Sequence, residues 1–375
     1  MVWTASPETN TRSFKDCIAE SPRDFVGYGF DTPADCWNGA KRDDGKKGDP
    51  KIVVSFVLNY EEGAEHTPWN GDTRTTEFLH EDHYHRLPTS GEKRDNVVES
   101  GVILISHQAK DITYPPPLQF EYGIRCGLPR ILKLFKKFDM QFTTWACARA
   151  LEVTAPYGQI LVANGHEIAC HGNRWRGTND LAGPDEEALD IKKSFKRLQD
   201  ATGLTNVPTG WFTGNGSTYQ RHIRAVVHKD MGVPLLYNSD TYNCDLPYYV
   251  SSPLALDGEK DEGMLMIPYS LTNNDHRFLV AAGNGVACSN DWFELLKGDF
   301  DYLLKEGRAG RPKMMTIAMH NRVLGKPGRI MALKRFMEYV AGQEEAWVTT
   351  RAKIASHWRE KYPYELVGPT VSMHQ

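Results

Sequence analysis

The first clear feature of the chain is an unbroken apolar stretch, IVVSFVLNY, at positions 52–60. It is rich in β-branched residues and has no helical period, a pattern typical of a strand that is covered on both faces. Similar but shorter stretches predict further strands at 141–147, 166–171, 209–214, 234–240, 264–270 and 313–320.

Amphipathic helices are predicted between these strands. The segment PRILKLFKKF begins at Pro129 and places Ile131, Leu134, Phe135 and Phe138 on one stripe. Further helical patterns occur at 155–163, 184–202, 218–231, 289–307 and 328–341. Repeated βα units predict parallel strands joined by right-handed crossovers. No glycine-rich phosphate loop separates a strand from a helix, so a deformed (β/α) barrel is favoured over a dinucleotide-binding sheet.

The chain divides into an arm and one barrel domain. Residues 1–50 are rich in Pro, Gly and charge, and we expect them to form an irregular arm that packs on the barrel. Residues 51–375 form the barrel domain, and the polar segment 72–119 reads as an insertion within it. The length of this insertion indicates a functional role.

Composition narrows the class of protein. The chain has 375 residues, a net charge of −4 and no basic cluster, so a nucleic-acid partner is not expected. Its seven cysteines are scattered and odd in number, which favours reduced thiols over a disulfide framework. No apolar leader or membrane span is found, so the chain as written is expected to be cytoplasmic, or secreted if a signal peptide has been removed.

Polar groups gather where the predicted strands end. Glu61 and Glu62 follow the strand at 52–60, and His171, Asn215, Asp240 and His320 end other strands. The carboxyl ends of parallel barrel strands meet on one face, where such folds carry their chemistry. Carboxylates beside histidines can take a proton from water and give one to a leaving nitrogen, so the sequence predicts hydrolysis.

Each of these groups also has a structural interpretation. The two glutamates are typical of a solvated turn, Asp240 of a cap, and His320 of a packed core imidazole. His166 and His171 lie five positions apart and have opposite parity in a strand, so at most one of them faces the site.

Several motifs taken together resemble the polysaccharide deacetylases, in the branch that holds allantoinases of that fold and fungal chitin deacetylase-like proteins. The motifs that carry the resemblance are VSFVLNYEEG, FEYGIRCG, GHEIACHG, GWFTG, NSDTYNCDLPYY, IPYSLTNNDHRF and MHNRVLGKPGR. The resemblance spans nearly the whole chain. The resemblance implies a deformed (β/α) barrel of the polysaccharide deacetylase type.

The resemblance also assigns roles. Glu61 matches the general base, His320 the general acid, and Asp240 the aspartate that tunes its neighbours. Glu62 and His171 match two metal ligands, and His66 is a candidate for a third. The expected substrate-binding residues are Trp175, Trp211, Gly214, Asn215, Tyr242 and Arg322.

Two departures from the family pattern bear on the cofactor. Trp175 stands where the second histidine of the metal motif is expected, and glutamates replace both aspartates of the first motif. Two ligands are too few for a tightly bound catalytic zinc. The cofactor prediction therefore includes both zinc or another divalent metal and metal-independent catalysis, as in the allantoinase-like branch. That branch also tends to carry an arginine where this chain has Asn215.

Three functions are consistent with the resemblance. The leading prediction is removal of N-acetyl groups from chitin oligosaccharides, and the alternative is ring opening of a cyclic ureide such as allantoin. The third is an inactive carbohydrate-binding homologue. The expected partners are thus a chitin oligosaccharide or a small amide, no nucleic acid and no membrane, with a homotetramer implied by the allantoinase-like relatives.

Overall fold

The computed structural model describes residues 33–73, 76, 118–177, 180–214, 216–217, 219–280 and 285–367. The first part of the predicted arm, most of the predicted insertion and Asn215 lie outside these residues. The described part of the arm packs on the barrel, because Trp37 is fully buried and its indole donates to the carbonyl of Lys313 at 3.2 Å. Within the described residues, no helix is long and apolar enough to cross a membrane.

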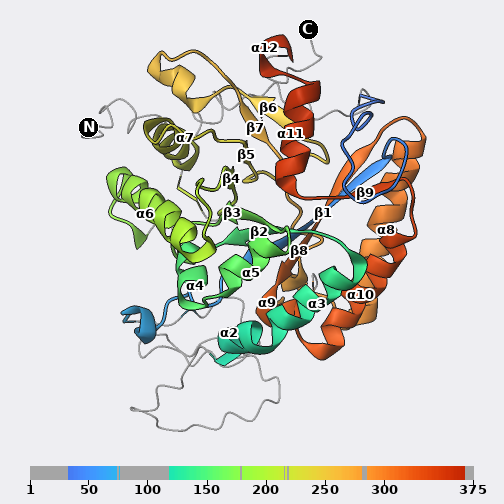
Figure 1. Ribbon diagram of the computed structural model, residues 1–375, viewed down its shortest axis with the longest axis horizontal. Coiled ribbons are helices and arrows are strands. Elements are labelled where there is room, and N and C mark those ends of the chain that lie inside the picture. The colour runs from blue at the N-terminus through green and yellow to red at the C-terminus, as the bar shows by residue number, and fades with distance from the viewer. Residues whose placement is uncertain are drawn as a thin grey trace, which may run out of the picture.

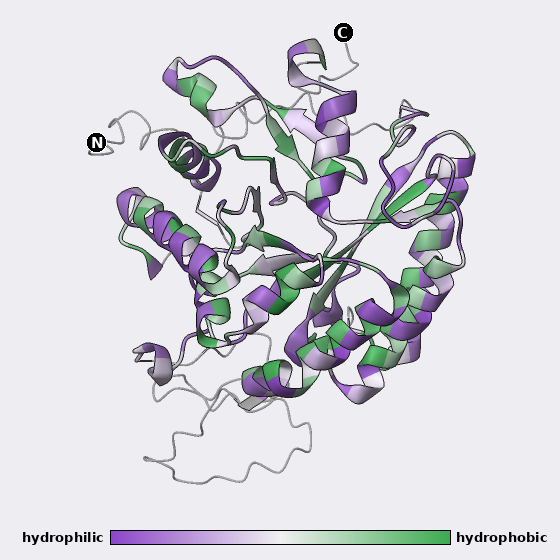
Figure 2. Ribbon diagram, viewed as in Figure 1, coloured by the Kyte–Doolittle hydropathy of each residue, from purple (hydrophilic) through white to green (hydrophobic). Residues whose placement is uncertain are grey.

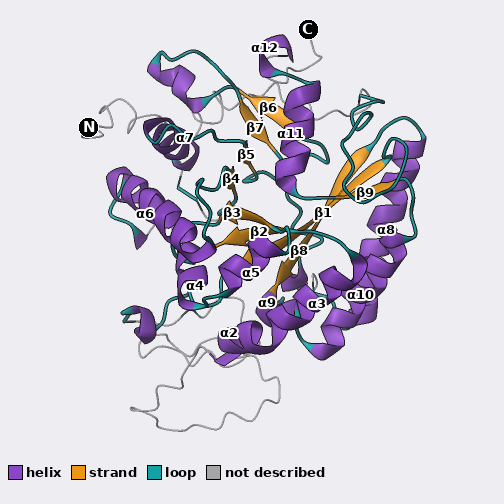
Figure 3. Ribbon diagram, in the orientation of Figure 1, coloured by secondary structure: helices purple, strands orange, loops and turns teal. Residues whose placement is uncertain are grey.

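A curled sheet forms the centre of the molecule, and helices surround it (Figures 1 and 3). Its strand order is β6-β7-β5-β4-β3-β2-β1-β8, and β9 also pairs with β1. Every pair is parallel except β6 with β7. The strands are β1 (Ile52–Tyr60), β2 (Thr143–Ala146), β3 (Glu167–Cys170), β4 (Gly210–Trp211), β5 (Tyr237–Asn238), β6 (Tyr248–Val250), β7 (Met264–Met266), β8 (Lys313–His320) and β9 (Ala346–Val348). The predicted deformed barrel is thus confirmed as an open half-barrel.

Helices follow the strands in the expected alternation and cover the outer face of the sheet (Figure 1). The helices are α2 (Leu118–Tyr122), α3 (Leu128–Phe138), α4 (Ala148–Val153), α5 (Tyr157–Ala163), α6 (Pro184–Thr202), α7 (Gln220–Asp230), α8 (Ser289–Arg308), α9 (Asn321–Leu324), α10 (Pro327–Ala341), α11 (Arg351–Lys361) and α12 (Tyr364–Val367). A π-turn, η3 (Gly123–Gly127), joins α2 to α3, and short 3₁₀ helices are η1 (Pro68–Asn70), η5 (Pro253–Asp257) and η6 (Asp275–Leu279).

The sheet separates two apolar cores. Val54, Phe56 and Leu58 of β1 point to the core under the outer helices, whereas Val53 and Val57 point to the core inside the half-barrel. Alternate strand residues face opposite sides of a sheet, so a strand buried on both sides must be apolar throughout. Figure 2 shows this as hydrophobic strands and as helices whose polar residues turn outward.

A buried arginine links the two ends of the curled sheet. The Arg351 guanidinium donates to Thr316 of β8 and to Ser239, which follows β5, each at 3.0 Å. It also donates to the carbonyls of Ile267 and Pro268, directly after β7. These bonds join the free edge of β8 to the other end of the sheet and satisfy a cation that would otherwise be costly to bury.

The π-turn η3 packs against the chain that leaves β8. A Cβ atom added at Gly127 would lie 2.1 Å from the carbonyl oxygen of Asn321, and one at Gly123 would lie 2.8 Å from the backbone nitrogen of Arg322. Only glycine permits this approach of two backbones. The contact fixes the position of the residues that directly follow His320.

Substitution of Gly127 by alanine is expected to destabilise the protein by about 1–3 kcal/mol, because the added methyl overlaps with a backbone oxygen that has little room to move. The measurement is the midpoint of urea denaturation. Gly298→Ala on α8 is the matched control: no heavy atom lies within 4 Å of the added Cβ, so helix propensity should raise stability by about 0.5–1 kcal/mol. Equal effects of the two variants would contradict this account of η3.

Candidate active site

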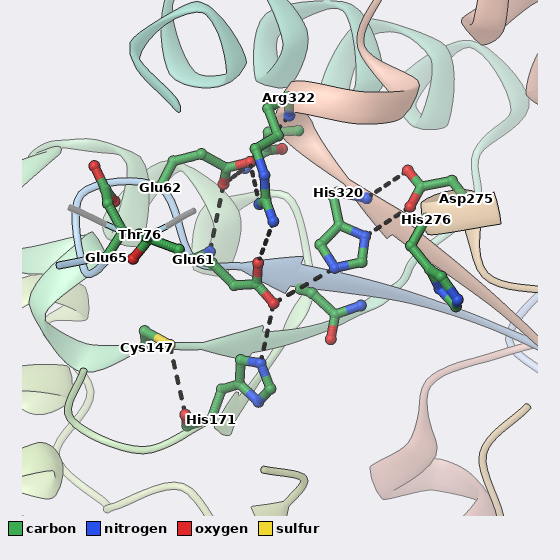
Figure 4. A network of polar contacts seen from close by, with 12 residues as sticks. Glu61, Glu62, Glu65, Thr76, Cys147, His171, Asp275, His276, His320 and Arg322 are labelled. Carbon is green, nitrogen blue, oxygen red and sulfur yellow. Dashed lines mark hydrogen bonds and ion pairs between the residues drawn. The ribbon is translucent and has the colours of Figure 1, made fainter. Parts of the chain in front are cut away.

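Five ionisable side chains converge where β1, β3 and β8 end. Glu61 and Glu62 follow β1, His171 follows β3, His320 is the last residue of β8, and Arg322 lies two residues further on, in α9. All five are at least 96% buried. Figure 4 shows the Glu61 carboxylate between the two imidazoles, with the Arg322 guanidinium above it. The predicted convergence of Glu61, His171 and His320 is thus present in the structure.

The Glu61 carboxylate is the centre of the group. Its Oε1 lies 3.3 Å from His171 Nε2 and 3.4 Å from His320 Nε2, and its Oε2 lies 2.8 Å from Arg322 Nη2. The pair with Arg322 is not aligned for a hydrogen bond, so Glu61 Oε2 and Arg322 Nη2 and Nε are buried without hydrogen-bond partners among the described residues. Burial raises the pKa of Glu61, but His320 and Arg322 outweigh it and hold that pKa well below its ordinary value.

Asp275, the first residue of η6, orients His320. Its Oδ1 accepts from His320 Nδ1 at 2.6 Å and its Oδ2 accepts from the His320 backbone N–H at 2.7 Å. Burial lowers the pKa of His320, but the carboxylates of Glu61 and Asp275 outweigh it and raise the pKa to about 9. At neutral pH this imidazole therefore carries a proton on Nε2, directed at Glu61.

His171 is oriented by the chain that follows β4. Its Nδ1 lies 2.7 Å from the carbonyl oxygen of Phe212 and its ring stacks on the Phe212 ring. A carbonyl oxygen only accepts, so Nδ1 carries a proton and Nε2 is the atom presented to Glu61. His166 instead stacks on Phe142 in the core, as its parity predicts.

Glu62 and Arg322 lie in contact beside Glu61. Glu62 accepts from the Asn321 amide and from the Arg322 backbone N–H, both at 2.9 Å, and it lies 3.3 Å from Arg322 Nη1. The guanidinium carbon lies 4.6 Å from the ring centre of Phe120 and 4.8 Å from that of Trp175. Two aromatic rings thus hold a cation that faces both glutamates. The sequence placed Trp175 and Arg322 in contact with substrate, whereas the structure places Trp175 behind Arg322.

The predicted metal ligands Glu62, His171 and His66 do not form one set, which corrects the prediction. His66 pairs with Asp72 and Asp180, at 3.3 and 3.0 Å, instead of approaching Glu62. In the part of the chain that the structure describes, no group of three or more His, Cys, Asp or Glu side chains is arranged to hold a metal ion. Both glutamates are already neutralised by a guanidinium, which would repel a dication. The donor set does not fit zinc.

Four further predicted site residues have other positions. Asp240 does not contact His320: it pairs with buried Arg224 at 2.5 Å and accepts from the Thr213 and Gly214 N–H groups at 2.8 Å. Asp240 therefore already occupies the Gly214 N–H group. Trp211 is a core residue, 1% exposed, whose indole donates to His228. Gly214 and Tyr242 line a separate cavity near the site.

Sequence reasoning missed Asp275, Asn321 and Phe120. Asp275 lies within the quoted motif IPYSLTNNDHRF, but a single aspartate 45 positions before His320 carries no local signal of that pairing. Asn321 follows His320 directly, and its contact with Glu62 spans 259 positions.

Comparisons with known proteins identify relatives of this chain. A family model described as polysaccharide deacetylase matches residues 117–234. A Schizosaccharomyces pombe (strain 972) protein provisionally named a polysaccharide deacetylase is 38% identical over 317 residues, which cover 84% of this chain and 92% of that protein.

Two solved structures are similar over almost their whole length. One is the Puue allantoinase, with 36% identity, a TM-score of 0.73 and coverage of 92% of this chain and 99% of that chain. The other is described as a probable polysaccharide deacetylase from Pseudomonas aeruginosa PAO1, with 34% identity, a TM-score of 0.72 and coverage of 91% and 99%. The chain belongs to the polysaccharide deacetylase family of hydrolases that act on amides.

Proposed function

We propose that the chain hydrolyses the C–N bond of a small amide of the cyclic-ureide class, without a metal. Glu61 acts as general base, His320 as general acid, and Arg322 as the cation that stabilises the oxyanion. One observation carries this proposal: the buried Glu61 carboxylate lies 2.8 Å from Arg322 Nη2 and 3.4 Å from Nε2 of the protonated His320, and Arg322 Nε has no hydrogen-bond partner among the described residues. An acceptor, two donors and an acid thus meet at one point.

The reaction follows from these atoms. Glu61 Oε2 takes a proton from water as the water oxygen bonds to the carbonyl carbon. The C–N bond then breaks, and the leaving nitrogen takes the proton from His320 Nε2. His171 and Asp275 act as positioning residues, because each holds one catalytic group at a fixed angle.

Arg322 links the two proton transfers. The guanidinium lowers the pKa of Glu61 in the resting site, which makes the carboxylate a weak base. As negative charge grows on the carbonyl oxygen, the guanidinium turns its unused donors to that oxygen and its hold on Glu61 weakens. The basicity of Glu61 therefore rises at the moment when the proton must move.

Burial favours a small substrate. Glu61, His320 and Arg322 are each 3% exposed, whereas a polysaccharide chain needs an open groove along its length. Small-molecule sites of this kind enclose most of the ligand and orient it with a few polar groups. The 36% identity to an allantoinase over 92% of the chain supports the same substrate class.

Deacetylation of N-acetylglucosamine in chitin oligosaccharides is the second candidate. A cavity of about 320 Å³ lies near the site, and Tyr242 in its wall is 47% exposed, as a sugar-stacking ring would be. The acid and base would be the same. The names of the S. pombe and P. aeruginosa relatives support this alternative.

Glu61→Gln is expected to lower kcat by about 10²–10⁴-fold, because the amide cannot accept the proton of water. The assays are allantoate formation from allantoin and acetate release from chitotetraose, run side by side. Glu338→Gln, which removes an exposed carboxylate on α10, should leave activity unchanged. Full activity of folded Glu61→Gln on either substrate would refute the role of Glu61, and binding without hydrolysis by the wild type would favour an inactive homologue.

Asp275→Asn should move the alkaline limit of activity downward by about 1–2 pH units, since it removes a carboxylate that raises the pKa of His320. In the wild type, kcat should fall as pH rises through about 9, where His320 loses its proton. The stabilisation from charged His320 is complete below the unfolded-state pKa of about 6.5 and is lost as pH rises through about 9. An unchanged kcat profile from pH 5 to 10.5 would show that Asp275 does not act through His320.

Removal of metal ions should leave activity unchanged, because Arg322 supplies the positive charge. The measurement is kcat before and after dialysis against a chelator, with metal content followed by mass spectrometry. Arg322→Met should lower kcat by at least about 10²-fold, in the range seen when one oxyanion donor is removed. Loss of activity on dialysis and its return with zinc would contradict the metal-independent mechanism.

A further inference from the structure

A polar cavity of about 320 Å³ lies beside the loop that follows β4. Its walls include Gly214 in the loop after β4, Gln220 and Arg221 at the start of α7, and Asp240 and Tyr242 after β5. That loop also carries Phe212, whose carbonyl oxygen holds His171. The Tyr242 and Tyr269 rings lie 5.9 Å apart, and the Tyr269 hydroxyl lies 3.4 Å from the amide of Asn59, two residues before Glu61.

The charges on the cavity wall do not cancel. Asp240 is neutralised by Arg224 and by the two N–H groups that it accepts, so it contributes no free negative charge. Arg221 is exposed and donates only to the backbone oxygen of Asp240, at 3.0 Å. Among the described residues, no carboxylate lies within ion-pair distance of Arg221. One positive charge thus remains at the cavity.

The position of Arg221 in its helix strengthens this charge. It lies in the first turn of α7, which has no acidic residue in that turn. A cation at a helix N-terminus is disfavoured, because the helix dipole already places positive potential there. An arginine that destabilises its own helix at a cavity wall is better explained by a ligand than by the fold.

Gln220 independently indicates a ligand. The residue is 6% exposed, yet its carboxamide has no hydrogen-bond partner among the described residues. It lies against Gly216, where an added methyl would overlap with Gln220 Oε1, so it cannot swing toward that loop. Its side chain lines the cavity, where a bound molecule would complete its hydrogen bonds.

We propose that this cavity binds a carboxylate of the substrate, held by the Arg221 guanidinium and the Gln220 amide N–H. The inference rests on the proposed function, since the ligand is the amide or ureide that is cleaved at Glu61. It restricts that substrate to molecules with a carboxylate a few bonds from the scissile C–N bond. A guanidinium can bind both carboxylate oxygens at once, so it separates an acid from its neutral amide.

The test measures binding apart from turnover. The Glu61→Gln variant is titrated by calorimetry with 5-carboxymethylhydantoin and with its neutral carboxamide, which differ only in the charged group. A second pair, N-acetylmuramic acid and N-acetylglucosamine, shows whether the carboxylate belongs to an amino sugar instead. We expect the acid of one pair to bind about tenfold more tightly than its neutral partner.

Adding Arg221→Gln should abolish this preference, and Arg221→Lys should retain part of it. The matched control is Lys229→Gln, which removes a charge from the same helix where Lys229 pairs with Glu259 outside the cavity. Equal affinities within both pairs, no binding of either pair, or a preference that survives Arg221→Gln would overturn the inference. Turnover by the wild type separates the two proposals. If the acid binds through Arg221 but is not hydrolysed, the proposed function alone is refuted. If the substrate is hydrolysed but its binding does not depend on Arg221, the inference alone is refuted.

Discussion

The burial of two adjacent carboxylates, Glu61 and Glu62, is the constraint on which the rest of the site depends. Both follow a strand that is covered on both faces, and both side chains are almost fully buried. Leaving one buried charge unpaired costs about 3–5 kcal/mol in proteins where a partner has been removed. The fold meets this cost with Arg322, which faces both glutamates, and with His320, which faces Glu61.

This compensation extends outward into the fold. Arg322 is itself buried, and Phe120 and Trp175 hold its guanidinium between their rings. The backbone that carries it is fixed by the glycine contacts of η3, which admit no side chain. His320 in turn needs Asp275, which lies at the start of η6. Groups that neutralise charge in the resting protein are therefore the same groups that are proposed to move protons and stabilise an oxyanion.

The identity of residue 175 affects both metal binding and the packing around Arg322. A histidine at this position would be a metal ligand by family resemblance, whereas the tryptophan instead packs on a guanidinium near the carboxylates. A fixed guanidinium offers directed hydrogen-bond donors and remains charged across the working pH range. Its charge is smaller than that of a dication, and the dry surroundings strengthen its effect.

The sequence by itself determined the barrel class and the place of the chemistry. Local sequence pattern was enough to predict the strand before Glu61 and the strands that end at His171 and His320. Because the ends of parallel strands meet on one face, it also predicted that these side chains lie together. Tertiary structure decided which charges pair. Asp240 pairs with Arg224, and Asp275 instead contacts His320, the role expected of Asp240. His66 pairs with Asp72 and Asp180 rather than with Glu62. Local pattern cannot specify these partners, since each is chosen by distance and desolvation between segments far apart in the chain.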